Sequence, residues 1–405
     1  HHRRADGCRA PVLSAIGEVM AVQRLSIVLV GAGVVAAKHK KAIDYLVKRH
    51  LAELSAVVDP NEQAAAALSL HTPVFASLSA CLAEVKPDIV AITTPSGTHA
   101  ELAELALTHG CHVLIEKPMT LSLKDADRLL QLAADAGKRI AVGHIFRYVP
   151  LADTLKSMVA DGRFGRCLYG DVKVRWGHDQ AYYDQAAWRG TYAADGGVLM
   201  NQSIHAIDLM QWLIGEKAVE AVAMAARQMH DMEGEDLALG IVRCTNNTYV
   251  QVEGTTNTDP ARHEASFALF FEKGDLRVRL SAGQIEAEVN VQGRKPVSGK
   301  ALLRQAVFAA VRREGIGIVR HMGNPHTFLY LDLVRAIANG GAVLADGQSG
   351  RDALATVLAI YRAAKERQVI SVRSAVAFPL KDMVGVPALN PAGRQADDKQ
   401  TETGL

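Results

Sequence analysis

The stretch LSIVLVGAGVVA, residues 25–36, joins a short apolar run to two glycines and the start of a helical segment. A run this rich in Val, Ile and Leu is typical of a buried strand. In the G-x-G-x-x-A pattern that follows, Gly31 permits a tight turn, Gly33 lets the backbone approach a pyrophosphate, and the small Ala36 allows helix and strand to pack closely. A glycine turn kept only for packing is the alternative. The predicted cofactor-binding residues of this turn are Gly31, Gly33, Val34, Val35 and Ala36.

An acidic residue ends the next apolar run, AELSAVVDP (52–60). A carboxylate at the end of the second strand can bind the ribose hydroxyls of a dinucleotide, so Asp59 is the candidate for this contact. No arginine adjoins Asp59-Pro60-Asn61 to accommodate a 2′-phosphate. The sequence therefore predicts NAD, in preference to NADP, as the cofactor.

Further strands and helices alternate along the first 150 residues. Strands are expected at 25–33, 52–60, 87–95, 112–118 and 139–146, with helices at 36–50, 61–70, 98–109 and 121–137. This alternation predicts a Rossmann-type, doubly wound parallel sheet. Later strands, which follow one another in series, are expected at 166–176, 218–228, 236–244, 248–256, 264–272, 275–281 and 284–291, with helices at 150–161, 301–314, 325–339 and 350–367. Their alternating apolar and polar residues favour an open, mostly antiparallel sheet.

The fold class is therefore α/β, with an N-terminal Rossmann domain followed by a C-terminal α+β domain. We expect four regions: a non-structural leader (1–22), an NAD-binding domain (23–147), a substrate-binding and oligomerisation domain (148–376) and a disordered tail (377–405). Within the leader, Met20 is the expected natural start, because the first strand begins a few residues later. The tail is polar and contains Pro and Gly, as disordered segments commonly are.

Composition excludes several classes of protein. The chain has 405 residues with 45 Lys and Arg against 43 Asp and Glu, which argues against a protein that coats nucleic acid or an anionic membrane. No apolar stretch is long enough to span a bilayer. The five cysteines are not closely paired, so neither a zinc site nor a disulfide framework is expected, and a reducing cytoplasm is the expected location. The basic stretch 300–321 is interpreted as a domain helix or subunit contact in preference to a membrane-surface helix.

Two segments carry candidate chemistry. Glu116-Lys117-Pro118 follows the fourth strand, and ligands of doubly wound sheets bind beyond the carboxyl ends of strands. The helix predicted in DGGVLMNQSIHAIDLMQWLIG (195–215) would place Asn201 and His205 on one face, with Asp208 three residues further. A solvated lysine and a buried core histidine are the alternatives for Lys117 and His205, and their coincidence with a nucleotide turn favours function.

The segment TPSGTHAELAELALTHGCHVLIEKPMTLSLKDADRL (94–129), together with the glycine-led helix, resembles the glucose–fructose oxidoreductase / inositol dehydrogenase / MocA family over about residues 25–372. The resemblance implies that Lys117 and His205 flank the reacting hydroxyl. It further implies that the T-P-x-x-x-H segment and EKP contribute cofactor-binding residues, namely Thr94, Pro95, His99, Glu116 and Lys117.

Asn201 departs from the commoner pattern of this family, which has aspartate one turn before the histidine. The departure points to a subgroup, because the Tyr-Tyr-Asp, Trp-Arg-Gly and Met-Asn-Gln segments look like those of UDP-N-acetylglucosaminuronate 3-dehydrogenases. "VGHIFRYVP" (142–150) looks more like general family members. The resemblance therefore implies the reaction class more firmly than the sugar.

Oxidation of a secondary alcohol moves a hydride to the nicotinamide while a base takes the hydroxyl proton. Histidine titrates near neutral pH, and a partly buried lysine can be tuned to it, so Lys117 or His205 could be the base. Arg189 can form paired hydrogen bonds with a phosphate or carboxylate, and an aromatic neighbour can stack on a base, although a packed loop explains the same residues. The candidate substrate-binding residues are Arg147, Tyr183, Trp188, Arg189, Asn201, Gln202, His205 and Asp208.

These observations predict an NAD-dependent dehydrogenase that oxidises a hydroxyl, at C3, of a nucleotide-activated N-acetylhexosamine or its uronate for surface-polysaccharide sugar biosynthesis. Its rivals are an inositol or free-sugar dehydrogenase of the same family and a non-catalytic dinucleotide-binding sensor. The expected partners are a small nucleotide-sugar and further copies of the chain, as a homodimer or homotetramer formed through the C-terminal sheet. Nucleic acid, stable membrane insertion and a metal are not expected.

Overall fold

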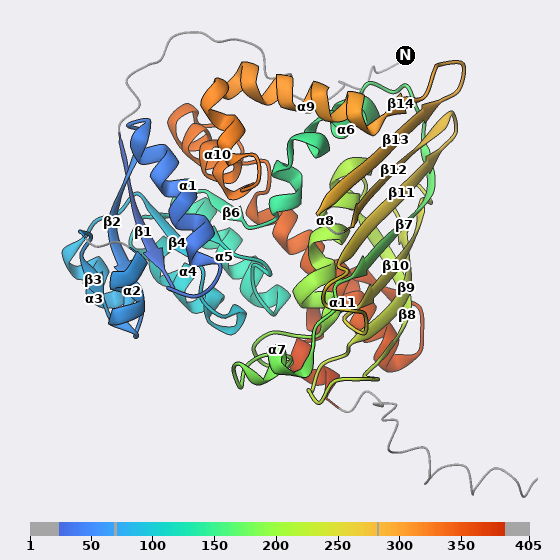
Figure 1. The fold of residues 1–405 in the computed structure, drawn as a ribbon. Helices are drawn as coiled ribbons and strands as arrows, with labels where there is room; N and C mark the ends of the chain where they lie inside the picture. The colour runs from blue at the N-terminus through green and yellow to red at the C-terminus, as the bar shows by residue number, and fades with distance from the viewer. Residues whose placement is uncertain (1–23, 69–70, 282, 385–405) are drawn as a thin grey trace, which may run out of the picture.

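The computed structural model describes residues 24–68, 71–281 and 283–384, which fold into two lobes, each built around a sheet (Figure 1). The predicted leader, 1–22, lies outside the described residues, as do residues 385–405 of the predicted tail. Residues 377–384 are ordered, because Leu380–Met383 forms a 3₁₀ helix whose Leu380 and Met383 side chains are buried. The tail expected at 377–405 therefore includes a segment, 377–384, that the structure describes.

The first sheet is parallel throughout, in the strand order β3-β2-β1-β4-β5-β6 among the described residues. This is the doubly wound Rossmann order, so the predicted fold of the N-terminal lobe is confirmed. The strands are β1 (Leu25–Val30), β2 (Ala52–Val58), β3 (Val74–Phe75), β4 (Ile89–Ile92), β5 (His112–Ile115) and β6 (Ile140–Val142). Its helices are α1 (Ala36–Lys48), α2 (Glu62–Leu68), α3 (Leu78–Glu84), α4 (His99–Thr108) and α5 (Leu123–Asp135). The sequence pattern does not predict β3 and α3, which are too short to show a period.

Helices cover both faces of this sheet, and alternate residues of β1 face opposite ways. Ile27 and Leu29 belong to a hydrophobic cluster with α1 and α10 (His326–Asn339). Val28 and Val30 belong to a second cluster that includes α3, α4 and α5. Because α10 lies near the C-terminal end of the described chain, the chain returns to the N-terminal lobe after leaving it (Figure 1). The predicted domain limits, 23–147 and 148–376, take no account of this return.

The second sheet has the order β14-β13-β12-β11-β7-β10-β9-β8-β15 among the described residues. Among the described strand pairs, only β7–β10 is parallel, so the predicted open, mostly antiparallel sheet is confirmed. Its strands are β7 (Cys167–Arg175), β8 (Ala218–Ala226), β9 (Leu237–Cys244), β10 (Tyr249–Thr255), β11 (Glu264–Phe271), β12 (Gly274–Ser281), β13 (Gln284–Val291), β14 (Val297–Ser298) and β15 (Ile370–Ser371).

Helices of the second lobe pack on one face of this sheet and against the first lobe (Figure 1). They are α6 (Pro150–Ala160), α7 (Gln180–Asp184), α8 (Ile204–Ile214), α9 (Gly299–Glu314) and α11 (Gly347–Glu366). The basic helix α9 buries Leu302, Ala306 and Ala310 and contacts α6 and β13, as expected of a domain helix. In the described part of the chain, no helix combines the length and apolar character needed to cross a bilayer.

The glycine-led segment leads into α8 through a π-helical turn, Leu199–Ser203, which its sequence pattern does not predict. The chain is crowded here: a Cβ on Gly197 would lie 2.1 Å from Glu235 Oε2. The buried Glu235 carboxyl accepts a hydrogen bond from the Leu199 N–H at 2.9 Å and one from the Tyr361 hydroxyl at 2.9 Å. Glu235 thus binds a backbone donor that the first turn of a helix leaves free.

Candidate active site

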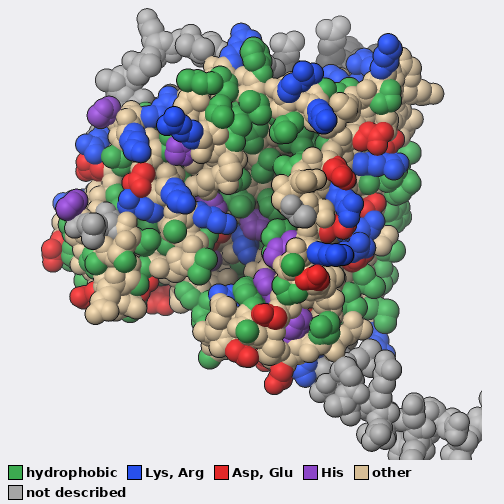
Figure 2. Space-filling view, viewed as in Figure 1, with side chains coloured by type: hydrophobic (Ala, Val, Ile, Leu, Met, Phe, Trp, Pro, Cys, Tyr) green, Lys and Arg blue, Asp and Glu red, His purple; other side chains and the backbone are tan. Residues whose placement is uncertain are grey.

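A cavity of about 280 Å³ opens between the two lobes. Figure 2 shows histidine and basic side chains gathered in the hollow between the lobes. The first lobe contributes Val35, Lys38, Thr94, Pro95, Ser96, Glu116, Lys117 and Ile145 to its lining. Opposite them lie Tyr182, Trp188, Arg189, Asp195, Asn201 and His205, whereas His326 of α10 lies on the first-lobe side beside Glu116. Residues predicted at the carboxyl ends of strands in the first sheet and residues predicted in the α8 segment therefore lie in one cleft.

The glycine turn lies at the carboxyl end of β1. Gly31 has a φ of 96°, and a Cβ there would lie 2.9 Å from the Thr93 carbonyl, so the turn requires glycine. Asp59 accepts a hydrogen bond from the Ala32 N–H at 2.7 Å, which holds its carboxylate against the turn. A Cβ on Gly33 would meet no atom within 4 Å beyond its chain neighbours, and Val34 is 87% exposed. The backbone is thus open to a pyrophosphate beside the start of α1.

The other predicted cofactor residues lie after β4 and in the EKP segment that follows β5. Thr94 and Pro95 line the cavity, whereas His99 is buried behind them. The two ring nitrogens of His99 lie 2.8 Å from the Pro118 carbonyl oxygen and 2.9 Å from that of Thr94. His99 therefore joins two loops of the cofactor side and does not itself line the cleft.

Lys117 extends from the end of β5 to the α8 segment. Its Nζ donates to the Asn201 carbonyl oxygen at 2.5 Å and to Asn201 Oδ1 at 3.2 Å. Burial lowers the pKa of Lys117, while the negative charges of Glu116 and Asp195 raise it and only partly oppose that shift. A lysine with a lowered pKa can hold and release a proton closer to neutral pH than a solvated one.

Glu116 lies beneath Lys117 in a cluster with two histidines from distant parts of the chain. His39 Nε2 and His326 Nε2 donate to Glu116 Oε1 at 2.8 and 2.9 Å, and the Tyr330 hydroxyl lies 3.0 Å from His39 Nδ1. Burial alone would raise the pKa of Glu116, but the hydrogen bonds from His326 and His39 hold it well below its usual range. The carboxylate is therefore ionised and fully engaged.

The same three side chains are ligand types that bind metals, and their ligand atoms lie within 4.8 Å of one another. Two ligands of a tetrahedral zinc ion lie about 3.3 Å apart, given metal–ligand bonds of about 2 Å. The two N···O distances here are 2.8 and 2.9 Å, which are those of direct hydrogen bonds. The cluster is therefore described as a hydrogen-bonded network, and the expected absence of a metal stays a prediction.

His205 lies on α8 across the cleft from the glycine turn, with its ring stacked on Phe146 at a centroid distance of 5.0 Å. Burial lowers the pKa of His205 well below its usual range, and the positive charges of Lys117 and His144 lower it further. Its Nδ1 is buried and has no hydrogen-bond partner among the described residues. The imidazole is therefore neutral at pH 7.

Arg189 lies between two aromatic rings at the opposite end of the cleft. Its guanidinium carbon is 4.3 Å from the Tyr182 ring centroid and 4.9 Å from that of Trp188. These contacts fix the planar cation by cation–π attraction. Arg189 Nε is buried without a hydrogen-bond partner in the described part of the chain. The site thus presents an oriented cation to an anionic ligand.

Arg147 and Asp208 are not brought to the cleft lining, contrary to their prediction as substrate residues. Arg147 Nη2 lies 2.6 Å from Asp208 Oδ1, and Arg147 Nε lies 2.7 Å from Asp208 Oδ2. Only 8% and 1% of their side-chain surfaces are exposed. The paired geometry neutralises two buried charges, so the pair braces α8 against the first lobe instead of facing a ligand.

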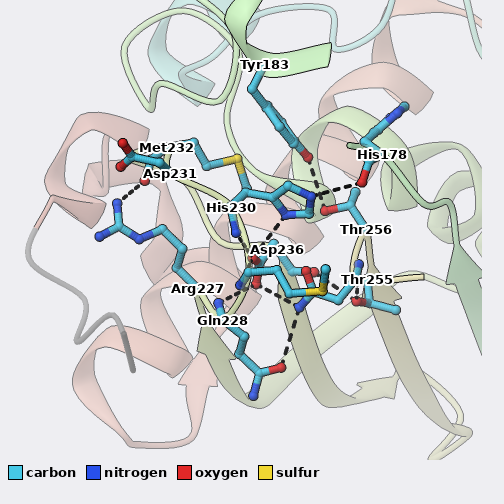
Figure 3. A network of polar contacts seen from close by, with 12 residues as sticks. His178, Tyr183, Arg227, Gln228, His230, Asp231, Met232, Asp236, Thr255 and Thr256 are labelled. Carbon is cyan, nitrogen blue, oxygen red and sulfur yellow. Dashed lines mark hydrogen bonds and ion pairs between the residues drawn. The ribbon is translucent and has the colours of Figure 1, made fainter. Parts of the chain in front are cut away.

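Tyr183 and Gln202 also lie outside the cleft lining. The Tyr183 hydroxyl donates to Thr256 Oγ1 at 3.1 Å in the polar network of Figure 3. Gln202 Nε2 lies 3.1 Å from His178 Nε2. Residue 182 takes the place predicted for 183, because α7 turns the two neighbouring side chains to different faces.

The network in Figure 3 is linked to the substrate side of the cleft through His178. The Asp236 carboxylate accepts hydrogen bonds from the backbone N–H groups of Gln228, Met229 and His230 at 2.8 to 3.0 Å. His230 Nε2 lies 3.0 Å from the His178 carbonyl oxygen, and the His178 ring stacks on the Tyr182 ring at a centroid distance of 3.7 Å. The loop that follows β8 therefore holds the aromatic wall of the cleft.

Several lining residues have no predictive signal in the sequence. Lys38, Ile145 and His326 reach the cleft through the packing of distant segments. Tyr182 is the neighbour of the predicted Tyr183, and only the observed backbone path distinguishes the two. Asp195 directly precedes the two glycines that lead into the helix, which is the one position where a local signal is present.

Comparisons with known proteins agree with this architecture. Residues 25–144 match the family model described as "Oxidoreductase family, NAD-binding Rossmann fold", and residues 152–277 match the GFO/IDH/MocA C-terminal domain. The UDP-N-acetylglucosamine 3-dehydrogenase of Acidithiobacillus ferrooxidans is 28% identical over 313 residues, which are 76% of this chain and 89% of that protein. The inositol 2-dehydrogenase of Streptomyces avermitilis is 32% identical over 227 residues, which are 52% and 60% of the two chains.

Among solved structures, the WlbA dehydrogenase from Bordetella pertussis in complex with NADH and UDP-GlcNAcA is 30% identical to this chain. The match covers 86% of this chain and 98% of that chain, with a TM-score of 0.75. The matches thus cover both lobes, including the nucleotide turn, the two sheets and the cleft between the lobes. The chain belongs to the Gfo/Idh/MocA family of oxidoreductases and is an NAD-binding member of it.

Proposed function

We propose that this protein oxidises a secondary hydroxyl, at C3, of a nucleotide-activated N-acetylhexosamine or its uronate. The observation that carries the proposal is the meeting of Lys117, His205 and Arg189 in one cleft next to the nucleotide turn. The A. ferrooxidans relative is named UDP-N-acetylglucosamine 3-dehydrogenase, and the B. pertussis structure contains NADH and UDP-GlcNAcA. Both support a nucleotide-sugar substrate.

The cofactor side fits a dinucleotide. The tight turn at Gly31, the exposed backbone at Gly33 and the carboxylate of Asp59 provide for a pyrophosphate and a ribose. NAD⁺ bound there would supply the acceptor for the hydride of the substrate carbon. Glu116 and Lys117 lie at the carboxyl ends of the strands, where the reacting end of the cofactor binds in this fold.

The proton of the substrate hydroxyl needs an acceptor within hydrogen-bond reach. Neutral Lys117 takes that proton and becomes an ammonium, which donates to the two oxygens of Asn201. The neutral ring of His205 lines the same cavity and either receives the proton onward or takes it first. Both orders leave a carbonyl at the oxidised carbon, with the hydride on the cofactor and the proton on the protein.

The proposed subunit contact uses the outer face of the second sheet. Met224 and Leu239 are cross-strand neighbours there, as are Val222 and Ile241, and Figure 2 shows apolar side chains along this edge of the molecule. The exposed apolar residues of this face on β7 to β10 are Tyr169, Val222, Met224, Leu239, Ile241 and Tyr249. Exposed apolar side chains gathered on one face of a sheet commonly mark a protein interface, which supports a homodimer or homotetramer. An Ile241→Lys variant that keeps the mass of the wild-type assembly in light scattering would contradict this contact.

The activity is tested with purified protein, NAD⁺ and separate UDP-N-acetylglucosamine, UDP-N-acetylglucosaminuronate and inositol. Deuterium at C3 of the accepted UDP-sugar should appear in the NADH, whereas deuterium at C4 should not. Turnover of inositol with no UDP-sugar would overturn the proposal in favour of a cyclitol dehydrogenase. Absence of hydride transfer from any of the three, with NAD still bound, would indicate a sensor.

A further inference from the structure

Among the described residues, the Lys117 ammonium contacts no carboxylate directly. Its two protein acceptors are the backbone and side-chain oxygens of Asn201, which carry no net charge. The carboxylate of Asp195 lies on the far side of the same amide and accepts a hydrogen bond from Asn201 Nδ2 at 2.7 Å. A cation, an amide and an anion are thus joined in series on the wall of the cleft.

The chemistry of the two end groups fixes the direction of the amide between them. An ammonium only donates and an ionised carboxylate only accepts, so Oδ1 of Asn201 must face Lys117 and Nδ2 must face Asp195. Turning the amide over would place two donors together at one end and two acceptors together at the other. Asp195 therefore determines which atom of Asn201 meets Lys117.

Asp195 is itself held rigidly. It is 3% exposed, its other carboxylate oxygen accepts the Gly190 N–H at 3.0 Å, and its own N–H donates to the Thr191 carbonyl at 2.9 Å. Burial raises the pKa of Asp195, while the Gly190 N–H and the positive charge of Lys117 oppose that rise. The mechanism proposed above does not use this buried carboxylate.

We propose that Asp195 is a positioning residue for Lys117, which orients the Asn201 amide and places a negative charge one hydrogen-bonded group away from the ammonium. The inference rests on the proposed role of Lys117 in proton transfer. It assigns to positions 195 and 201 together the task that a single carboxylate in contact with the lysine would perform. A neutral group at 195 would leave the amide free to turn its Nδ2 toward Lys117.

The charge has a consequence of definite sign. The negative charge of Asp195 raises the pKa of Lys117 against the effect of burial. Removing it by Asp195→Asn should therefore lower the pH at which Lys117 loses its proton. Adding a closer carboxylate by Asn201→Asp should raise that pH, because the opposite charge then contacts the ammonium directly.

The test measures Lys117 without any substrate. Purified wild type, Asp195→Asn, Asn201→Asp and the double variant are labelled with acetic anhydride across a pH series, and labelling of the Lys117 peptide is read by mass spectrometry. The midpoint should move to lower pH in Asp195→Asn, to higher pH in Asn201→Asp, and back to or above the wild-type value in the double variant. Asp184→Asn, which removes an exposed charge at the end of α7, should leave the midpoint unchanged.

A midpoint that is unchanged in Asp195→Asn, or that moves equally in Asp184→Asn, would overturn the inference. If Asp195→Asn does not fold, Asn201→Asp decides the matter, because an unmoved midpoint there would contradict charge coupling at this position. With UDP-sugar, kcat should fall about tenfold in Asp195→Asn through misplacement of the lysine, and recover in the double variant. Failure of the wild type to oxidise any UDP-sugar would count against the proposed function and would leave the labelling result to judge Asp195 separately.

Discussion

The two walls of the cleft satisfy their polar groups in different ways. On the cofactor side, the Glu116 carboxylate accepts from two histidines, and the Asp59 carboxylate holds the glycine turn. On the substrate side, Arg189 Nε and His205 Nδ1 are buried with no hydrogen-bond partner among the described residues. The cofactor wall is therefore complete before any ligand binds, whereas the substrate wall keeps donors and acceptors for its ligand. Changes in the first should cost stability, and changes in the second should cost substrate binding.

The largest effect is expected at Lys117, which spans both walls. Lys117→Met removes the proposed proton acceptor while keeping much of the volume, so kcat for UDP-sugar oxidation should fall by about 10³. NADH formation followed by absorbance measures the loss, and titration with NAD⁺ should show that the cofactor still binds. The exposed Lys124→Met serves as the matched control. A Lys117→Met variant within tenfold of wild type would remove this lysine from the chemistry.

Glu116→Gln tests whether the cofactor wall is complete in itself. Loss of the charge weakens two hydrogen bonds to buried histidines, so the free energy of unfolding at pH 7 should fall by about 2–3 kcal/mol. The pKa of Glu116 is lower in the folded than in the unfolded chain, so its contribution is present above the unfolded pKa and is lost as the pH falls. Urea unfolding should therefore show the difference from wild type narrowing below pH 4.5.

The exposed Glu101→Gln is the control for that experiment. If Glu116→Gln left stability unchanged and altered only substrate affinity, the division between a complete cofactor wall and an incomplete substrate wall would be wrong.

Arg189→Ala makes the opposite test on the substrate wall. Loss of a charge-assisted hydrogen bond to an anionic ligand should raise KM for the UDP-sugar about 30-fold. Stability should fall by only about 1 kcal/mol, because the variant loses the cation–π contacts with Tyr182 and Trp188, whereas the buried Nε has no hydrogen-bond partner in the described protein to lose. The control is Arg262→Ala, whose side chain is 85% exposed. A large loss of stability with an unchanged KM would make Arg189 a structural residue.

Asp236→Asn tests the network linked to the substrate wall, with the smallest expected effect. Burial raises the pKa of Asp236, but the His230 ring and backbone N–H donors outweigh it and lower the pKa to about 2. The contribution to stability, roughly 1.5 kcal/mol, is thus present above pH 3.8 and lost as the pH falls toward 2. Unfolding of variant and wild type should converge over that interval, whereas the exposed Asp231→Asn should show no difference at either pH.

The sequence predicts that Lys117, Asn201 and His205 lie close together, because the position of each residue follows from a short-range pattern. Ligands bind at the carboxyl ends of parallel strands, and residues four apart share a helix face. Their catalytic roles stay predictions. His39 and His326 could not be placed in the same way, since their meeting at Glu116 depends on α10 returning to the first lobe.

The substrate wall is less predictable for a different physical reason. Polar residue type alone does not reveal that Arg147 and Asp208 neutralise each other, because 61 positions separate them. Tyr182 and Tyr183 differ by one position, which on a helix turns a side chain by about 100°. The choice between them depends on the start of the short helix α7, a boundary that sequence patterns fix poorly.

The π-helical turn at Leu199–Ser203 makes the active-site wall sensitive to chain length as well as to residue identity. A π turn holds more residues than the α-helical turn that could replace it, and it lies between the two glycines and His205. Deleting one residue there would rotate all of α8 by about 100° against the chain that precedes it, while every side chain of the helix remained present. His205 would leave the cleft and Asp208 would leave Arg147 together. A homologue that aligns without a gap at this turn can therefore place the same residues in the site. A homologue with a deletion there has the same residue types in its sequence but places them elsewhere in the structure.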